Sequence, residues 1–355
     1  MGARSLHDRS SSSVIGNVKE TPVYLDKNEN PFRLPPSLRE EIRQLISSID
    51  LNRYPDPEGN KIKQVLSELT GVPEENLVIG NGGDEILSML FTAFIEKGAR
   101  VVSLSPTFSQ YPELCRRHRA EWIPVPLGIG DKEIDFDEDL FIATVSRYSP
   151  ALILVDTPNN PTGKVISNNF LTRLAESASG VIVVDEAYGE FSSSTFLETF
   201  RNRMIPGKLC ILKTLSKAWG MAGLRIGYGA CSPSVSSGIE KVRDLYNVGL
   251  LSQEIGAIVL QYREWMESRV LSIRYMRDQL IQVINRIPGW HAYNSDSNFV
   301  LVRSDFSKSL LLDQMEEAAI HVKFLDLDSP GNWLRVSIGR EDELGRFVSL
   351  IEKVR

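Results

Sequence analysis

The sequence is poor in the residues that build disulfide frameworks and metal sites. Its 355 residues include only 3 cysteines and 4 histidines, and Cys115, Cys210 and Cys231 lie far apart with no C-x-x-C pair. Because disulfide scaffolds and zinc sites need recurring, closely spaced ligands, we expect core or near-surface thiols in a reducing cytoplasm and no metal site.

Long apolar runs and a strong charge of one sign are also missing. No apolar stretch approaches the ~20 residues of a membrane-spanning helix, and the net charge of −6 argues against a general nucleic-acid binder. We therefore expect neither a membrane nor a nucleic acid as partner. The first residues carry arginines and serines without the apolar core of a secretory signal, so residues 1–30 are expected to form an N-terminal arm.

The chain does have a regular alternation of apolar strands and helices. Strands are predicted at 76–80, 100–104, 121–126, 151–156, 181–185, 209–212 and 225–230. Amphipathic segments lie between several of them. This pattern predicts an α/β fold with a mainly parallel seven-stranded sheet covered by helices.

The pattern changes beyond Cys231. The periodicity from Ser252 to Ile287 predicts one unusually long helix. Short strands at 298–302, 321–324 and 333–338 and a terminal helix from Glu341 follow. We expect a large domain over residues 31–240, which would bind any cofactor, and a smaller α+β domain over residues 241–355.

Notable polar and aromatic residues follow the carboxyl ends of the predicted strands, where ligands bind in open parallel sheets. They are Gly82, Gly83, Phe108, Asn160, Asp185 and Lys217. The two glycines stand between a strand and a helix, and free backbone N–H groups at a helix start suit a phosphate. Neither a G-x-G-x-x-G fingerprint nor a Walker lysine is present, so a dinucleotide or P-loop site is not favoured.

This combination of residue types fits the chemistry of pyridoxal 5'-phosphate. The aldehyde of that cofactor forms a Schiff base with a lysine, and its ring nitrogen stays protonated opposite a carboxylate. Lys217 and Asp185 are the candidates for these two parts. Ser216 and Arg225 add a hydroxyl and a guanidinium for the phosphate.

From Tyr24 to its C-terminus, the chain resembles the histidinol-phosphate aminotransferase family of fold-type I enzymes. The motifs that carry the resemblance, in the family's order, are Leu25-Asp-Lys-Asn-Glu-Asn-Pro31, Arg53-Tyr-Pro-Asp-Pro57, Pro158-Asn-Asn-Pro-Thr-Gly163, Asp185-Glu-Ala-Tyr188, Thr214-Leu-Ser-Lys217 with Gly223-Leu-Arg225, and Leu334-Arg335. The resemblance implies amino-group transfer from histidinol phosphate to 2-oxoglutarate in histidine biosynthesis, by a homodimer.

The resemblance also implies roles around the cofactor. Lys217 would carry it and move a proton, Asp185 would pair with its ring nitrogen, and Tyr188 with Asn160 would hold its phenolic oxygen. The residues implied for its phosphate are Gly82, Gly83, Asp84, Thr214, Ser216 and Arg225. Phe108 would stack on the ring, and Tyr54 would reach the cofactor of the neighbouring subunit.

Substrate would be bound by Arg335, Lys323 and Asn30. Arg335 matches the family's binder of the α-carboxylate, since arginine recognises a carboxylate with two parallel hydrogen bonds. Lys323 stands where the family usually has an arginine. The lysine keeps the positive charge but cannot form the two parallel hydrogen bonds of a guanidinium. Ser10–Val18 replaces a proline-tyrosine segment that many relatives place against the substrate phosphate.

These departures leave two alternatives open, an enzyme like threonine-phosphate decarboxylase and an aromatic amino acid aminotransferase. A cofactor-dependent regulator would need a DNA-binding helix-turn-helix. The ~20 polar residues before Tyr24 cannot supply one.

Overall fold

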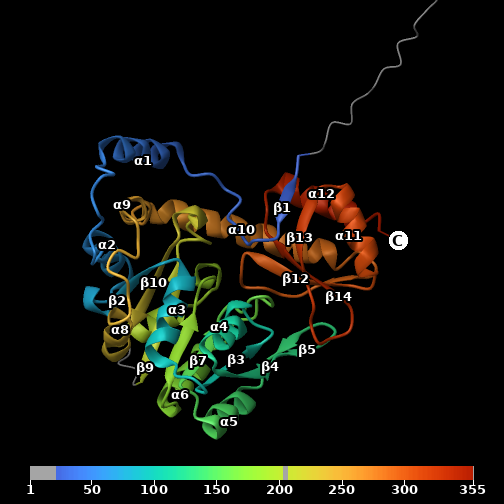
Figure 1. The fold of residues 1–355 in the computed structure, drawn as a ribbon. Coiled ribbons are helices and arrows are strands. Elements are labelled where there is room, and N and C mark those ends of the chain that lie inside the picture. Colours follow the sequence, from blue (N-terminus) through green and yellow to red (C-terminus); the bar gives the residue numbers. More distant parts are fainter. Residues whose placement is uncertain (1–20, 203–206, 355) are drawn as a thin grey trace, which may run out of the picture.

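The structure is a computed structural model that describes residues 21–202 and 207–354. Most of the predicted N-terminal arm, including Ser10–Val18, lies outside the described residues. The described part of the chain forms two lobes, and a long helix runs from one to the other (Figure 1).

The large lobe is built on the predicted seven-stranded sheet, in the order β2-β10-β9-β8-β7-β3-β4. The strands are β2 (Leu77–Asn81), β3 (Arg100–Ser105), β4 (Glu121–Pro126), β7 (Leu152–Asp156), β8 (Val181–Asp185), β9 (Lys208–Thr214) and β10 (Ile226–Cys231). β10 runs antiparallel to both of its neighbours, and the other strands are parallel to one another. The prediction of a mainly parallel α/β sheet is confirmed.

Strands β7 and β8 show why the sheet is covered on both faces. All their residues are buried, and alternate side chains enter two separate apolar clusters. Ile153 and Ile182 belong to the larger cluster, whereas Leu152 and Val181 belong to the smaller one. Continuous apolar runs are what a strand needs when both of its faces are packed.

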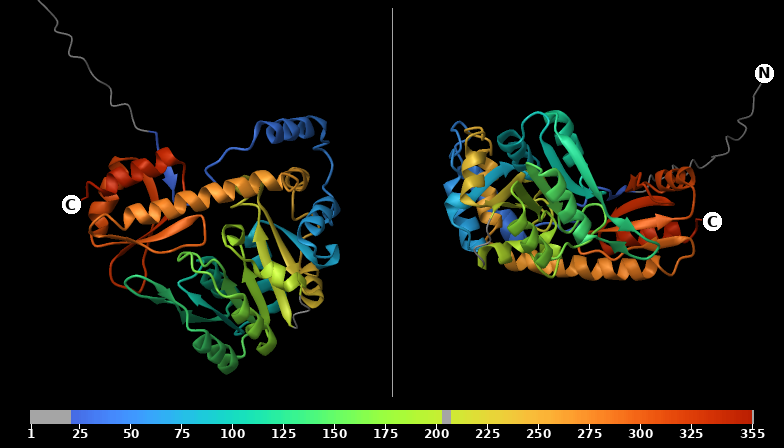
Figure 2. Two further views of the ribbon diagram at one scale, coloured as in Figure 1. Left: turned by 180° about the vertical axis from the view of Figure 1, so that it is seen from behind. Right: turned by 90° about the horizontal axis from the view of Figure 1, so that it is seen from below.

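Helices of this lobe pack on both faces of the sheet (Figure 2), whereas α1 (Pro36–Ser48) lies apart from the sheet and packs on α9 (Leu250–Val259). The other helices are α2 (Asn60–Thr70), α3 (Gly83–Phe94), α4 (Gln110–His118), α5 (Glu138–Tyr148), α6 (Asn168–Ser177), α7 (Phe196–Asn202) and α8 (Pro233–Glu240), with 3-10 turns η1 (Glu74–Asn76), η2 (Gly189–Phe191) and η3 (Ala222–Leu224) and a hairpin of β5 (Gly128–Ile129) and β6 (Ile134–Asp135). Helices α3, α4 and α8 pack in the smaller cluster and α6 and α9 in the larger. Cys115, Cys210 and Cys231 are free, as predicted, and all three are buried.

The small lobe has a five-stranded sheet in the order β1-β13-β14-β12-β11. Its elements are β1 (Val23–Leu25), β11 (Trp290–Ala292), β12 (Phe299–Ser304), β13 (Ile320–Leu325), β14 (Asn332–Ser337), α11 (Lys308–Glu317) and α12 (Glu341–Ile351). β1 pairs with β13 in parallel. The beginning of the described chain thus completes a sheet made by its end.

The predicted single helix from Ser252 to Ile287 is wrong, because α9 ends before α10 (Arg263–Ile284) begins. Tyr262 leaves the helical conformation, with φ −92° and ψ 43°, and its hydroxyl donates to Glu41 of α1 at 2.9 Å. The backbone therefore leaves the helix at Tyr262, beside a contact with a distant helix, although the pattern is continuous in sequence. The predicted division at residue 240 stays a prediction; α9, which follows it, packs against α1 and α2.

Candidate active site

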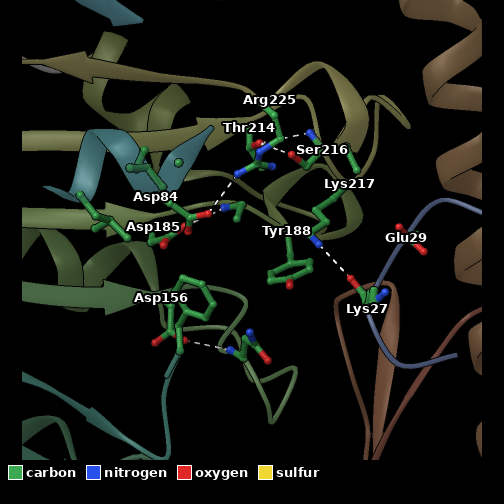
Figure 3. Close-up of a pocket in the computed structure, with 17 residues that line it drawn as sticks. Lys27, Glu29, Asp84, Asp156, Asp185, Tyr188, Thr214, Ser216, Lys217 and Arg225 are labelled. Atoms are coloured by element: carbon green, nitrogen blue, oxygen red, sulfur yellow. Dashed lines mark hydrogen bonds and ion pairs between the residues drawn. The ribbon is translucent and has the colours of Figure 1, made fainter. Parts of the chain in front are cut away.

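A cavity of about 270 Å³ lies at the carboxyl ends of the large sheet. Figure 3 shows its lining residues. The predicted site residues that line it are Gly83, Asp84, Phe108, Asn160, Asp185, Tyr188, Thr214, Ser216, Lys217 and Arg225. The structure therefore brings together side chains from five strand ends, as open parallel sheets do.

The start of α3 forms one wall of the cavity. Gly82 has φ +82°, and a Cβ atom there would lie 2.5 Å from Nη2 of Arg225, so glycine alone fits beside the guanidinium. Arg225 itself has φ +54° and forms an ion pair with Asp84 at 3.0 Å. Free N–H groups at a helix start and an arginine on the same wall are donors for an anion.

Thr214 and Ser216 provide hydroxyls beside this wall. Thr214 Oγ1 lies 3.0 Å from both Ser216 Oγ and the Ile226 carbonyl, and it accepts the Ser216 N–H at 3.1 Å. Thr214 has one hydroxyl proton for these two acceptors. When it donates that proton to Ser216 Oγ, the Ser216 proton is available to a ligand in the cavity.

Lys217 reaches into the cavity from the turn after β9. Its Nζ donates to the backbone carbonyl of Lys27 at 3.0 Å and lies 5.8 Å from the centre of the Tyr188 ring. Asn30 supports this turn from outside, because its Nδ2 donates to the Ala218 carbonyl at 3.0 Å. The side-chain amide of Asn30, which was predicted to bind substrate, thus contacts the backbone of the turn that carries Lys217.

Asp185 ends β8 as a buried carboxylate. Its Oδ1 accepts the Ala187 N–H at 3.0 Å and its Oδ2 accepts the Tyr111 hydroxyl at 2.9 Å. Burial, with the negative charge of Asp156, raises the pKa of Asp185 to about 7 against the effect of these donors. Within the described part of the chain, no ion pair joins Asp185 to a cationic side chain, so a protonated ring nitrogen would supply the missing charge.

Asp156 lies beside Asp185 on the neighbouring strand and is missing from the sequence prediction. It accepts hydrogen bonds from the Thr107 hydroxyl, the Asn159 side chain and the Asn160 N–H, and burial raises its pKa to about 6. These bonds fix the loop that carries Asn160. The sequence does indicate Asp156, because this aspartate ends a buried strand in the same way as Asp185 does.

Arg335 approaches from β14 in the small lobe. Its Nη1 donates to Asn160 Oδ1 at 2.6 Å and its Nη2 to the Asp26 carbonyl at 2.7 Å, while its buried Nε has no partner. The bond from Arg335 leaves Asn160 Nδ2 to donate into the cavity. Lys323 is exposed and sits opposite Arg335 in the sheet, so the two side chains leave the same face.

Tyr188 is held by residues that the sequence analysis overlooked. Its hydroxyl accepts a bond from Asn28 Nδ2 at 2.9 Å, which leaves the phenol proton for a ligand. Asn28 is buried, and it also bonds Ser337 and Asn298. The sequence analysis recognised the motif Leu25–Pro31 and singled out Asn30 in it, but the asparagine of this motif that contacts Tyr188 is Asn28.

Tyr54 lies away from the cavity of its own chain. Its side chain is 80% exposed and stacks on Tyr246 with 4.6 Å between ring centres. Leu51 and Leu245 are exposed as well. The structure therefore gives this tyrosine no partner in the cavity of the described chain.

The residues of the cavity fit pyridoxal phosphate. A lysine amine, an unpaired carboxylate, the face of Phe108 and the donors at the start of α3 match the aldehyde, ring nitrogen, ring and phosphate. The described residues contain no cluster of three or more histidine, cysteine or acidic side chains that could hold a metal ion.

Comparisons with known proteins agree with this chemistry. Residues 20–351 match the family described as aminotransferase class I and II. The histidinol-phosphate aminotransferase of Thermoanaerobacter pseudethanolicus is 34% identical over 88% of each chain, and that of Caldanaerobacter subterraneus is 32% identical over 93% of this chain and 92% of the relative.

Solved structures show the same fold. A histidinol-phosphate aminotransferase from Sinorhizobium meliloti in complex with pyridoxal 5'-phosphate has a TM-score of 0.82 at 23% identity and covers 94% of this chain and 90% of that one. The L-threonine-O-3-phosphate decarboxylase of Porphyromonas gingivalis has a TM-score of 0.78 at 19% identity and covers 93% and 98%. Likeness of fold therefore does not separate the two reactions.

Proposed function

The chain belongs to the class I and II aminotransferases, and we propose that it transfers the amino group of histidinol phosphate to 2-oxoglutarate in histidine biosynthesis, with pyridoxal 5'-phosphate as cofactor. The observation that carries the proposal is a cavity in which Lys217 and the unpaired carboxylate of Asp185 face the same space. The named relatives supply the substrate.

When bound, pyridoxal phosphate supplies an aldehyde for a covalent link to an amine and a protonated ring that withdraws electrons. Lys217 Nζ would provide the amine, and as a free amine it would take the proton from the substrate carbon that bears the amino group. Asp185 keeps the proton on the ring nitrogen. Tyr188 and Asn160 each direct a free donor at the phenolic oxygen.

The phosphate is held by the wall at the start of α3. Backbone N–H groups of Gly83 and Asp84 supply fixed donors, and Ser216 adds a hydroxyl. Arg225 adds a charged donor beside Gly82. Its bond to Asp84 at the surface is weak enough for a bound dianion to compete with it.

The small lobe binds the anionic groups of the substrates. Glutamate carries an α-carboxylate, and histidinol phosphate carries a phosphate ester near its amino group. Arg335 offers its guanidinium beside Asn160 to the group next to the reacting carbon. Lys323 leaves the same face of the sheet and binds the phosphate of histidinol phosphate or the side-chain carboxylate of glutamate.

The active enzyme is a homodimer in the cytoplasm. An exposed group of apolar side chains, Leu51, Tyr54, Leu245 and Tyr246, supports the dimer, since single apolar side chains are common on surfaces but groups of them mark interfaces. In the dimer, Tyr54 reaches the cofactor phosphate of the other subunit. Three free buried cysteines support a reducing compartment.

The test is a half-reaction screen with the purified, cofactor-loaded protein. Histidinol phosphate, glutamate, aromatic amino acids and threonine phosphate are mixed with it in turn, and the absorption spectrum reports conversion to the pyridoxamine form. We expect conversion with histidinol phosphate and glutamate, and none with Lys217→Ala. Lys323→Ala should raise KM for histidinol phosphate roughly tenfold and leave a neutral aromatic donor unchanged.

Three results would contradict the proposal. Release of carbon dioxide from threonine phosphate without pyridoxamine formation would assign a decarboxylase. Preference for aromatic donors over histidinol phosphate would assign an aromatic aminotransferase. Turnover that survives Lys217→Ala would remove the catalytic role of Lys217.

A further inference from the structure

Tyr111 joins two walls of the cavity from behind. It lies on α4 and is fully buried. Its hydroxyl donates to Asp185 Oδ2 at 2.9 Å. Its ring meets Phe108 edge to face, with 5.9 Å between ring centres and an angle of 83°. One side chain therefore contacts both the carboxylate and the aromatic face that enclose the proposed cofactor ring.

The Tyr111 bond completes the fixing of the Asp185 carboxylate. Ala187 donates to one oxygen and Tyr111 to the other, on different atoms of the same planar group. With both oxygens held, rotation of the carboxylate is restricted, and remaining lone pairs can face the cavity. Bonds to an ionised acceptor are stronger than neutral ones, and burial strengthens them further.

Tyr111 also acts against the charges that oppose ionisation of Asp185. The ionisable groups that line the cavity with Asp185 are Lys27, Glu29, Asp84, Asp156, Tyr188, Lys217 and Arg225. Burial and the two aspartates raise the pKa of Asp185, whereas the Tyr111 hydroxyl lowers it. The phenol itself stays protonated, because burial raises its own pKa well above the usual range.

We propose that Tyr111 is a positioning residue for Asp185: its hydroxyl keeps the carboxylate ionised and oriented toward the cofactor ring nitrogen, while its ring edge supports Phe108. The inference rests on the cofactor site proposed above. It adds a residue outside the cavity lining, which acts through Asp185 and touches neither cofactor nor substrate.

The test compares Tyr111→Phe with Tyr293→Phe, a matched control. Tyr293 is also buried, and its hydroxyl donates to the Gly130 carbonyl at 2.8 Å. The apoprotein of each variant is titrated with pyridoxal phosphate over about pH 5 to 8. We expect Tyr111→Phe to bind roughly tenfold more weakly near pH 6, with a smaller deficit at higher pH, and Tyr293→Phe to match the wild type.

A second readout needs no cofactor. In apoprotein labelled with ¹³C at aspartate carboxyls, the Asp185 signal, assigned with Asp185→Asn, should titrate about one unit higher in Tyr111→Phe. In the loaded enzyme, kcat should fall while KM for the amino donor stays unchanged. At position 111, only a side chain that restores the hydroxyl is expected to restore the wild-type kcat.

Two outcomes overturn the inference. One is unchanged cofactor affinity and an unchanged Asp185 titration in Tyr111→Phe. The other is an equal loss in Tyr293→Phe, which would indicate a general effect on stability. A wild type that binds the cofactor but transfers no amino group refutes the proposed reaction and leaves the Tyr111 comparison valid; a wild type that binds no cofactor overturns both.

Discussion

Several residues of the cavity are held in conformations or protonation states that the protein alone does not favour. Asp185 is a buried carboxylate without a cation. Arg335 nearby is partly buried and its Nε has no partner, and burial lowers the pKa of its guanidinium. Such groups are costly in an empty site and useful in a filled one. The residues proposed to bind the cofactor and substrate should therefore limit the stability of the apoprotein.

Asp185→Asn should stabilise the apoprotein at neutral pH. The pKa of Asp185 is raised in the folded state to about 7, so the folded protein binds its proton more tightly than the unfolded chain. The ionised Asp185 carboxylate therefore destabilises the fold. This destabilisation is absent below the pKa of the unfolded state, ~3.9, and grows as the pH rises from there through the pKa of the folded state. Thermal unfolding should give the variant a Tm on the order of 5 °C higher at pH ~8, and no difference at pH ~4.

Asp278→Asn is the control, because this aspartate is exposed and paired with Arg277. A Tm difference between Asp185→Asn and wild type that stays constant across this pH range would show that the carboxylate does not titrate as described.

The reversed strand β10 shapes the cavity wall at the start of α3. It lies between β2 and β9, and Gly227 passes directly under the start of α3. A Cβ atom at Gly227 would lie 2.5 Å from the carbonyl carbon of Gly82 and the nitrogen of Gly83. This close approach fixes the position of the backbone N–H groups at the start of α3 relative to Arg225, the residue that directly precedes β10.

Gly227→Ala should therefore displace the start of α3. Overpacking of this kind costs about 1–3 kcal/mol of stability, and shifted donors should weaken binding of pyridoxal phosphate by at least roughly tenfold. Calorimetry and spectrophotometric titration measure the two effects. Gly223→Ala is the matched control, since a Cβ atom there meets nothing within 4 Å; equal effects of both substitutions would contradict the proposed role of the close approach.

Elements with continuous apolar runs were predictable from the sequence, and elements made by distant contacts were not. The strands of the large sheet are long enough to be recognised alone, whereas β5 and β6 have two residues each. The helix break falls at Tyr262, whose hydroxyl bonds Glu41 of a distant helix. In the site, the strand ends predicted the positions of Lys217 and Asp185. Which of Asn28 and Asn30 contacts Tyr188 was not predictable, because it depends on the direction of the backbone at Asn28, which has φ +54°.

At the scale of the whole molecule, the cavity has walls from both lobes. The segment after β1 lies along it: Lys27 accepts the Lys217 bond, and the Asp26 carbonyl accepts a bond from Arg335. The chain then leaves the small lobe and enters α1, which packs on α9 of the large lobe. Relative movement of the lobes would therefore change the surroundings of Lys217 directly.

Tyr54→Phe should loosen the cofactor several-fold without changing the fold, because in the proposed dimer its hydroxyl donates to the phosphate bound by the other subunit. Cofactor titration and circular dichroism measure the two properties, and light scattering should give about twice the chain mass of 39.8 kDa. Tyr24→Phe, an exposed tyrosine of the small lobe stacked on His321, serves as the control. A stable, fully active monomer would refute the shared site.

The pairing of β1 with β13 has a consequence for synthesis of the chain. The hydrogen bond from the Asn28 N–H to Ser337 joins residues 309 positions apart, so the first described segment leaves the ribosome long before its partners exist. A nascent or truncated chain that ends before β14 can form β7, β8 and β9 with Lys217 at their edge, yet it lacks Arg335 and the support of Tyr188. The cavity is lined by residues from Lys27 to Arg225, but Ser337, which holds Asn28 beside Tyr188, and Arg335, which bonds Asn160, are made last. The complete set of donors around the cavity therefore forms only after β14 has been synthesised.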